Sequence, residues 1–135
     1  MSEPVRLEEI AEAVARTAAA RPLLGHLTSI MPSIIEHNVS LESVCDFKTG
    51  SLYLMQDCAR FLHSRTPSLS IPAYEELIHR TIVMITGLLP LSHPSSVALE
   101  ALEPPELAPF RYNFERELAR GLLLLLRGLS QERKV

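Results

Sequence analysis

The sequence is poor in the residues that hold very small proteins together. It contains no Trp, 5 Gly and 2 Cys among 135 residues, and Cys45 and Cys58 do not form a CxxC pair. A disulfide framework is therefore not expected. No basic start followed by an apolar run marks a signal peptide, and the longest apolar stretch, residues 82–91, is far shorter than the ~20 residues of a membrane helix. We predict a cytoplasmic protein without membrane contact.

The chain also lacks an excess of positive charge. Thirteen Lys and Arg oppose 16 Asp and Glu, for a formal net charge of -3. This balance provides no general basic surface for nucleic-acid phosphates. Residues 7–13 resemble the first helix of a helix-turn-helix, but the chain continues as an alanine-rich helix instead of a tight turn and a basic second helix. We predict no direct nucleic-acid contact by these residues.

What the chain does have is helical periodicity. Apolar residues recur every three or four positions, and neither alternating strand patterns nor Asn-Gly and Asp-Gly turns occur. With 47% hydrophobic residues, a chain of this length can bury a core without metal or disulfides. We predict an all-α single domain, a five-helix bundle with helices at residues 5–20, 23–35, 41–63, 72–90 and 109–129.

Prolines and serines define the expected helix ends. Pro32 lies inside the second helix and predicts a kink near residues 28–33. Ser40 is expected to cap the third helix. The proline-rich segment 91–108 predicts a long connection with at most one short helix, and residues 130–135 are expected to form a frayed tail.

The third helix carries a wide apolar face that we expect to contact neighbours on two sides. Both cysteines lie on or beside this face and are expected to behave as small buried hydrophobic residues. Lys48 stands where the stripe predicts an apolar residue. The ordinary interpretation is that its stem is buried while its ammonium group reaches water.

Five consecutive leucines, residues 122–126, dominate the last helix. At 3.6 residues per turn they cover every face, which a helix exposed to water on one side would not need. We therefore predict a two-fold dimer interface formed by this helix and helix 72–90. The residues expected at the interface are Leu118, Leu122, Leu123, Leu125, Leu126 and Leu129.

Catalytic patterns are not evident. The sequence has no Gly-x-Ser-x-Gly elbow and no glycine-rich phosphate loop, and none of the five histidines has zinc-site spacing. Glu76 and His79 form one Glu-x-x-His step, whereas a di-iron bundle needs two such pairs and two further glutamates. We predict no enzyme, no metal and no cofactor, with a bundle metalloenzyme based on Glu76 and His79 as the weakest alternative.

Three segments together resemble a known family. They are residues 36–42 (EHNVSLE) followed by Phe47 and Lys48, then Pro105-Glu106-Leu107, and finally the leucine-rich residues 121–129. In this order they are similar to the C-terminal regulatory domain of tetracycline-repressor-like (TetR family) transcriptional regulators.

The resemblance implies a homodimer joined by a four-helix bundle and a cavity for a small apolar or amphipathic effector. Residues 1–21 would be the connector helix and residues 22–129 the ligand-binding and dimerisation core, with DNA bound by a helix-turn-helix domain that this chain does not contain. Lys48 could pair with an anionic head group of the effector. The residues expected to bind it are His26, Ile30, Phe47, Lys48, Met55, Tyr74 and Ile78.

A second class of function stays open at this point. Polar residues within an apolar bundle also occur in ordinary cores, so the chain could be a stand-alone helical protein-interaction module without a ligand. The identity of the effector, the operator, and the choice between repression and activation do not follow from periodicity.

Overall fold

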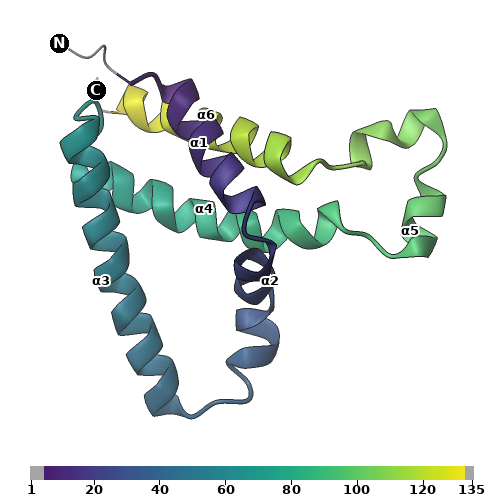
Figure 1. Cartoon of the computed structure of the whole chain (residues 1–135), viewed down its shortest axis with the longest axis horizontal. Coiled ribbons are helices and arrows are strands. Elements are labelled where there is room, and N and C mark those ends of the chain that lie inside the picture. The colour runs from purple at the N-terminus through teal and green to yellow at the C-terminus, as the bar shows by residue number, and fades with distance from the viewer. Residues whose placement is uncertain (1–4, 133–135) are drawn as a thin grey trace.

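The computed structural model describes residues 5–132, and all of the regular structure in this range is helical, without a strand. The prediction of an all-α domain is confirmed. Six α-helices are present in this range where five were expected, and a π-helical turn and a 3-10 turn accompany them (Figure 1). The elements are α1 (Leu7–Ala19), α2 (Pro22–Ile30), η1 (Met31–Ile35), α3 (Leu41–Arg65), α4 (Ile71–Ser92), α5 (Ser96–Ala101), η2 (Pro105–Phe110) and α6 (Phe114–Glu132).

Helix α4 is the centre of the fold. It packs against α2, α3 and α6, while α1 packs mainly against α6 and touches α2. The buried core therefore lies between α1, α4 and α6, with contributions from the end of α3 and the turn after it. Its members are Ile10, Ala11, Ala15, Ala59, Leu69, Tyr74, Leu77, Leu118, Leu122, Leu126 and Leu129.

Serine side chains cap the N-termini of three helices. Ser40, Ser70 and Ser95 each accept a hydrogen bond from the backbone N–H three residues later, at 3.1 to 3.2 Å. Each bond satisfies one of the N–H groups that the first turn of a helix leaves without a partner. The predicted capping role of Ser40 is confirmed.

Helix α2, η1 and α3 form a limb that leaves the core and returns to it (Figure 1). The α-helical pattern stops at Ile30 and a wider π-turn containing Pro32 follows, which confirms the predicted kink. Pro32 has no N–H to donate, so the helix must widen or break at this point. Just before it, Thr28 and Ser29 return their hydroxyls to the carbonyls of Leu24 and Gly25, which also favours bending.

The expectation for α3 is wrong in one respect. Its apolar face packs against α4 near its C-terminal end, and Ala59 is its one buried residue. Leu41, Phe47 and Leu54 are exposed by 80%, 51% and 65%. Cys45 and Cys58 are likewise exposed and free, not buried. The limb diverges from the core, and α4 is the only helix of residues 5–132 that packs against α3, so most of the length of α3 stays uncovered in the described part of the chain.

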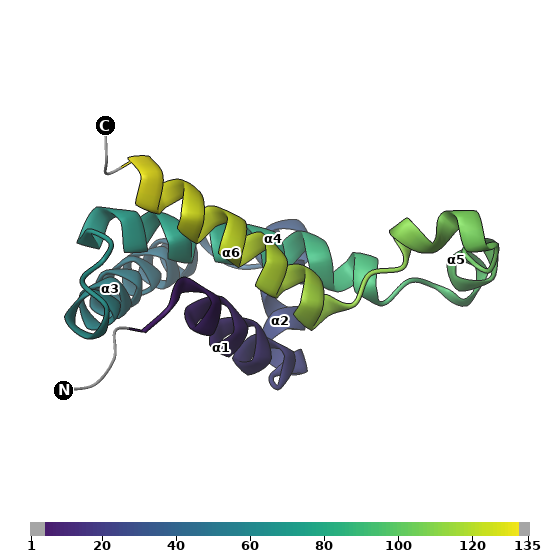
Figure 2. The same cartoon turned by 90° about the horizontal axis from the view of Figure 1, so that it is seen from above.

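Residues 94–111, called the arm below, contain α5 and η2 and extend beyond the ends of α4 and α6 (Figure 2). The connection was predicted, and so was the short helix within it. Helix α6 begins at Phe114, later than expected, because Pro109 lies inside a 3-10 turn that ends at Phe110 instead of starting an α-helix. It then continues to Glu132, so residues 130–132 of the predicted tail are helical, and residues 133–135 lie outside the described range. No described helix is long and apolar enough to span a bilayer.

Candidate functional site

The seven residues expected to bind a ligand do not converge on one site. His26 is exposed on α2, while Ile30 and Met55 are half-buried in α2 and α3 and line none of the cavities described below. Phe47 and Ile78 each line a cavity, but these are two different cavities. Helical periodicity indicates which residues are apolar, whereas the divergence of the limb separates them in space.

Lys48 and Phe47 lie at the far end of the limb. The Nζ of Lys48 is 2.8 Å from Oε1 of Glu36, so this ion pair ties α3 to the end of η1. Beside it is a hollow of about 200 Å³ lined by Met31, Ile35, Glu36, Val39, Ser43, Val44 and Phe47. Lys48 therefore already has an anionic partner within the chain.

Tyr74 belongs to the core and not to a ligand site. It is fully buried, and its hydroxyl donates a hydrogen bond of 2.5 Å to the carbonyl oxygen of Thr66. Burial raises the pKa of the Tyr74 phenol, because the charged form would lose its hydration. We therefore remove Tyr74 from the ligand-binding residues: its polar atom satisfies the turn between α3 and α4.

An apolar cavity of about 180 Å³ lies between α1, α4 and α6. Helix α1 supplies one wall, and Leu62 of α3 closes one side. The hydroxyl of Thr81 donates to the carbonyl oxygen of Leu77 at 2.6 Å, so this polar group is already satisfied. The lining residues are Ile10, Ala11, Val14, Leu62, Leu77, Ile78, Thr81, Ile82, Leu122 and Leu126. Of the predicted ligand residues, Ile78 alone is among them.

The contribution of α1 to this cavity was missed. Ile10 and Val14 belong to the first predicted helix, residues 5–20, where no ligand-binding residue was expected. Alanines at positions 11 and 15 of this helix are almost completely buried, at 2% and 0% exposure. Small side chains allow α1 to approach α6 closely, and the same small side chains leave space beside them.

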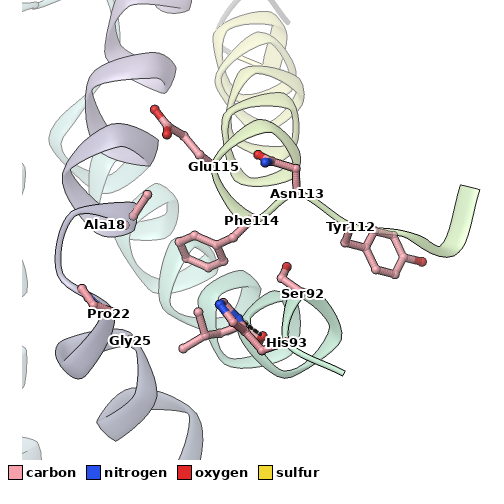
Figure 3. Close-up of a pocket in the computed structure, with 11 residues that line it drawn as sticks. Ala18, Pro22, Gly25, Ser92, His93, Tyr112, Asn113, Phe114 and Glu115 are labelled. Carbon is pink, nitrogen blue, oxygen red and sulfur yellow. Dashed lines mark hydrogen bonds between the residues drawn. The ribbon is translucent and has the colours of Figure 1, made fainter. Parts of the chain in front are cut away.

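A further hollow, of about 320 Å³, lies where the ends of α1, α2, α4 and α6 meet (Figure 3). The ring of Phe114 points toward Ala18 and Pro22, and Nδ1 of His93 is 3.1 Å from the carbonyl oxygen of Leu89. Gly25 forms part of the wall. A Cβ at this position would stand 3.1 Å from Cδ2 of Leu89, so α2 and α4 approach each other closely here. This hollow has a more polar lining than the apolar cavity, with Ser92, Asn113 and Glu115 at its edge.

An ion pair fastens the start of α1 to α6. The guanidinium group of Arg127 is 3.2 Å from Oε1 of Glu8. A hydrogen bond from the backbone N–H of Glu8 lowers the pKa of its carboxyl group, and the hydrogen bond from Arg127 lowers it further. Helix α1, which forms one wall of the apolar cavity, is thus also held to α6 by an ion pair.

The leucines of α6 divide between two environments. Leu118, Leu122, Leu126 and Leu129 are buried in the core of their own subunit by α1 and α4, at 8% exposure or less. We therefore withdraw these four from the interface, because they leave no surface for a partner. Leu123 and Leu125 are half-buried. The leucine that is exposed, by 51%, is Leu124, which the sequence prediction had left out.

Five exposed positions, Val83, Gly87 and Leu91 on α4 and Leu124 and Gly128 on α6, are together called the outer face below. Val83 and Leu91 on α4 are exposed by 59% and 54%, and Gly87 lies between them at helical spacing. Gly128 follows Leu124 one turn later on α6. Among residues 5–132, and apart from the adjacent residues and backbone of the same helix, no atom lies within 4 Å of the position that a Cβ would take at Gly87 or Gly128.

The Glu-x-x-His step has a structural role in this fold. Oε1 of Glu76 accepts a hydrogen bond of 2.9 Å from Nε of Arg80 one turn later. Within residues 5–132, no three His, Cys, Asp or Glu side chains gather as metal ligands would.

The described residues form an all-helical domain, and its cavities lie between packed helices. The family model of the tetracyclin repressor-like C-terminal domain matches residues 1–133, so this chain belongs to that family. Domains of this family are parts of transcription regulators, not of enzymes. No curated protein sequence matches the chain.

Proposed function

We propose that this chain is the effector-binding and dimerisation domain of a cytoplasmic TetR-like regulator. In this proposal a small apolar molecule binds between the helices and modulates DNA binding by a separate N-terminal helix-turn-helix domain. Residues 1–21 act as the connector to that domain, and residues 22–129 form the sensing and pairing core.

The observation that carries the proposal is that the connector helix itself forms a wall of the apolar cavity. Ile10, Ala11 and Val14 of α1 face residues of α4 and α6 across a space of about 180 Å³. Pockets for drug-sized ligands are commonly about 300 to 1,000 Å³. A small apolar ligand can enter as the cavity stands, and a larger one requires a wall to move outward.

Helix α1 is the wall that a larger ligand would displace. It packs along α6 through Ile10, Ala11 and Ala15 but does not pack against α4, so the cavity lies open between these two helices. Helices α4 and α6 pack on each other directly, with Leu77 and Leu118 in the buried core. A ligand that binds better when α1 is displaced shifts the equilibrium toward that arrangement, which is the requirement for coupling to a reading head.

The dimer in this proposal forms through the outer face of α4 and α6. Within residues 5–132, 19 large hydrophobic side chains are exposed while 11 hydrophobic residues form the buried core, so much apolar surface is left for partners. Val83, Leu91 and Leu124 supply apolar contacts, and Gly87 and Gly128 allow helices of a second subunit to approach closely. A two-fold pairing of this surface would make a four-helix bundle.

Two alanines one turn apart on α1 test the effector cavity. Ala11→Leu places its added carbons inside the cavity, so binding of the uncharged fluorophore N-phenyl-1-naphthylamine should be lost while the fold is kept. Ala15→Leu is the matched control, because Ala15 is fully buried but is not among the residues that line the apolar cavity. Overpacking there should cost about 1 to 3 kcal/mol of stability without filling the cavity. Equal binding by Ala11→Leu and the wild type would refute this location of the site.

The dimer is tested by placing a charge on the outer face. Leu124→Glu and Val83→Glu should convert a dimer into a folded monomer, as measured by light scattering and circular dichroism. Leu41→Glu, the same change on α3 at a site exposed by 80%, should leave the dimer intact. Copurified ligand is sought separately by native mass spectrometry. A dimer that binds no apolar ligand would favour the interaction module.

A further inference from the structure

The arm, residues 94–111, is held together by hydrogen bonds of its own, and its helical turns do not pack against the other helices of residues 5–132. Within residues 5–132, neither α5 nor η2 packs against another helix. Nε of Arg111 donates to the carbonyl oxygen of Leu102 at 2.7 Å, and Nη2 donates to those of Glu103 and Pro104 at 3.1 and 3.0 Å. Four prolines further restrict the backbone. A loop that only joined α4 to α6 would not need this internal order.

The arm exposes three large apolar side chains. Val97, Leu99 and Phe110 are exposed by 75%, 55% and 57%. The arm leaves the end of α4 just after Leu91 and rejoins α6 at its start, so it projects from one end of the pair of helices that carries the outer face (Figure 2). An element that is rigid before it docks loses little conformational entropy on docking.

The charges of the arm indicate which surface it would meet. Glu100, Glu103 and Glu106 form no ion pair among the described residues, and the guanidinium group of Arg111 is occupied by carbonyl oxygens. On α6, Arg116 and Arg120 are exposed one turn apart, again without an ion pair within the described range, with Glu115 and Glu117 next to Arg116 in sequence and Glu12 of α1 across a shallow hollow from it. The arm extends beyond the first turn of its own α6, away from the rest of that helix (Figure 2).

We propose that the arm docks on a second copy of this chain, with its apolar residues and its three glutamates along the Arg116–Arg120 edge of the partner's α6. This inference rests on the dimer of the proposed function. By two-fold symmetry the contact occurs twice, so each subunit holds the other through an element that its own core does not use.

Charge reversal and rescue in the full 135-residue chain test the contact. Glu100→Lys, Glu103→Lys and Glu106→Lys together should raise the dissociation constant of the dimer at least about tenfold, since several ion pairs are lost in each dimer. Arg116→Glu with Arg120→Glu should weaken it similarly. The combination of all five changes should return the constant to within about threefold of the wild-type value, because the pairs re-form with exchanged signs. Glu42→Lys, Asp46→Lys and Asp57→Lys on α3 make the same change in net charge and should have little effect.

Paramagnetic labelling shows directly where the arm lies. A nitroxide on Ala98→Cys, in a chain with Cys45→Ser and Cys58→Ser, is mixed with isotope-labelled subunits that carry no nitroxide. Broadening of the amide signals around Arg116 and Arg120 in the isotope-labelled subunits is expected. A stable dimer without this broadening, or without rescue by the five changes, overturns the arm contact and leaves the proposed dimer standing. A chain that is monomeric at a concentration of about 10⁻⁴ M overturns both the arm contact and the proposed dimer.

Discussion

Truncation of Leu122 distinguishes a leucine that holds the subunit together from one that binds a partner. Leu122 is exposed by 1% and lines the apolar cavity beside Leu126. Leu122→Ala removes a buried isobutyl group and enlarges a space that already exists. Buried Leu→Ala changes cost about 2 to 5 kcal/mol, and the cost rises with the volume that the structure cannot refill. The neighbours of Leu122 are fixed on three helices, so we expect a loss of about 3 to 4 kcal/mol.

The corresponding change in melting temperature follows from the size of the chain. An unfolding entropy of about 2.1 cal/mol/K per residue over 135 residues gives about 280 cal/mol/K. A loss of 3 kcal/mol then lowers the melting temperature by about 10 °C. Leu124→Ala, at a side chain exposed by 51%, should lower the stability of the isolated subunit by less than about 1 kcal/mol.

Urea unfolding followed by circular dichroism at several protein concentrations measures both effects. The loss in Leu122→Ala should not depend on concentration, because it arises within one subunit. The effect of Leu124→Ala should be seen only where the wild type is dimeric, since dimerisation stabilises by mass action. If Leu122→Ala dissociated the dimer but left the isolated subunit as stable as the wild type, the assignment of Leu122 to the core would be refuted.

Three further predictions follow from individual contacts. Tyr74→Phe should destabilise the subunit by about 1 to 3 kcal/mol, because the carbonyl oxygen of Thr66 loses its buried partner. The raised pKa of Tyr74 means that its stabilising effect is complete below about pH 10 and is lost as the pH rises further, and Tyr74→Phe should abolish this alkaline step in a pH series of melting curves. The lowered pKa of Glu8 has the opposite sign: its contribution is present above about pH 4.5 and falls as the carboxyl group is protonated below that value, so Glu8→Gln should flatten the acid limb of the same series. Gly128→Ala and Gly50→Ala should each stabilise an isolated subunit by up to about 1 kcal/mol through helix propensity, but Gly128→Ala alone should weaken the dimer; equal dimer affinities would remove Gly128 from the interface.

The regular features of the sequence predicted the elements well. Apolar periodicity depends on local geometry, so the three- and four-residue steps identified each long helix, and the lack of an N–H at Pro32 predicted the irregular turn after α2. Ser40 could be assigned as a cap for the same reason, because its partner is only three residues away. Family membership agrees with the motifs of residues 36–42 and 121–129.

The ligand site could not be predicted in the same way. Periodicity places Phe47 and Ile78 on apolar faces of their helices. In the fold the two residues line different cavities, because the kinked limb carries α3 away from α1 and α6. The sequence alone assigned Lys48 no ion-pair partner within the chain, and only the fold brings Oε1 of Glu36 within 2.8 Å of its Nζ.

The sequence by itself determined that this protein is helical, where its helices break, and that α6 has more leucine than one buried face requires. The tertiary structure alone decided which leucines serve the core and which one is left outside. A run of five leucines presents apolar side chains in every direction, and nothing local distinguishes those directions. The packing of α1 and α4 against α6 buries Leu122 and Leu126 and leaves Leu124 exposed, so the position of neighbouring helices, not composition, selects the surface available to a partner.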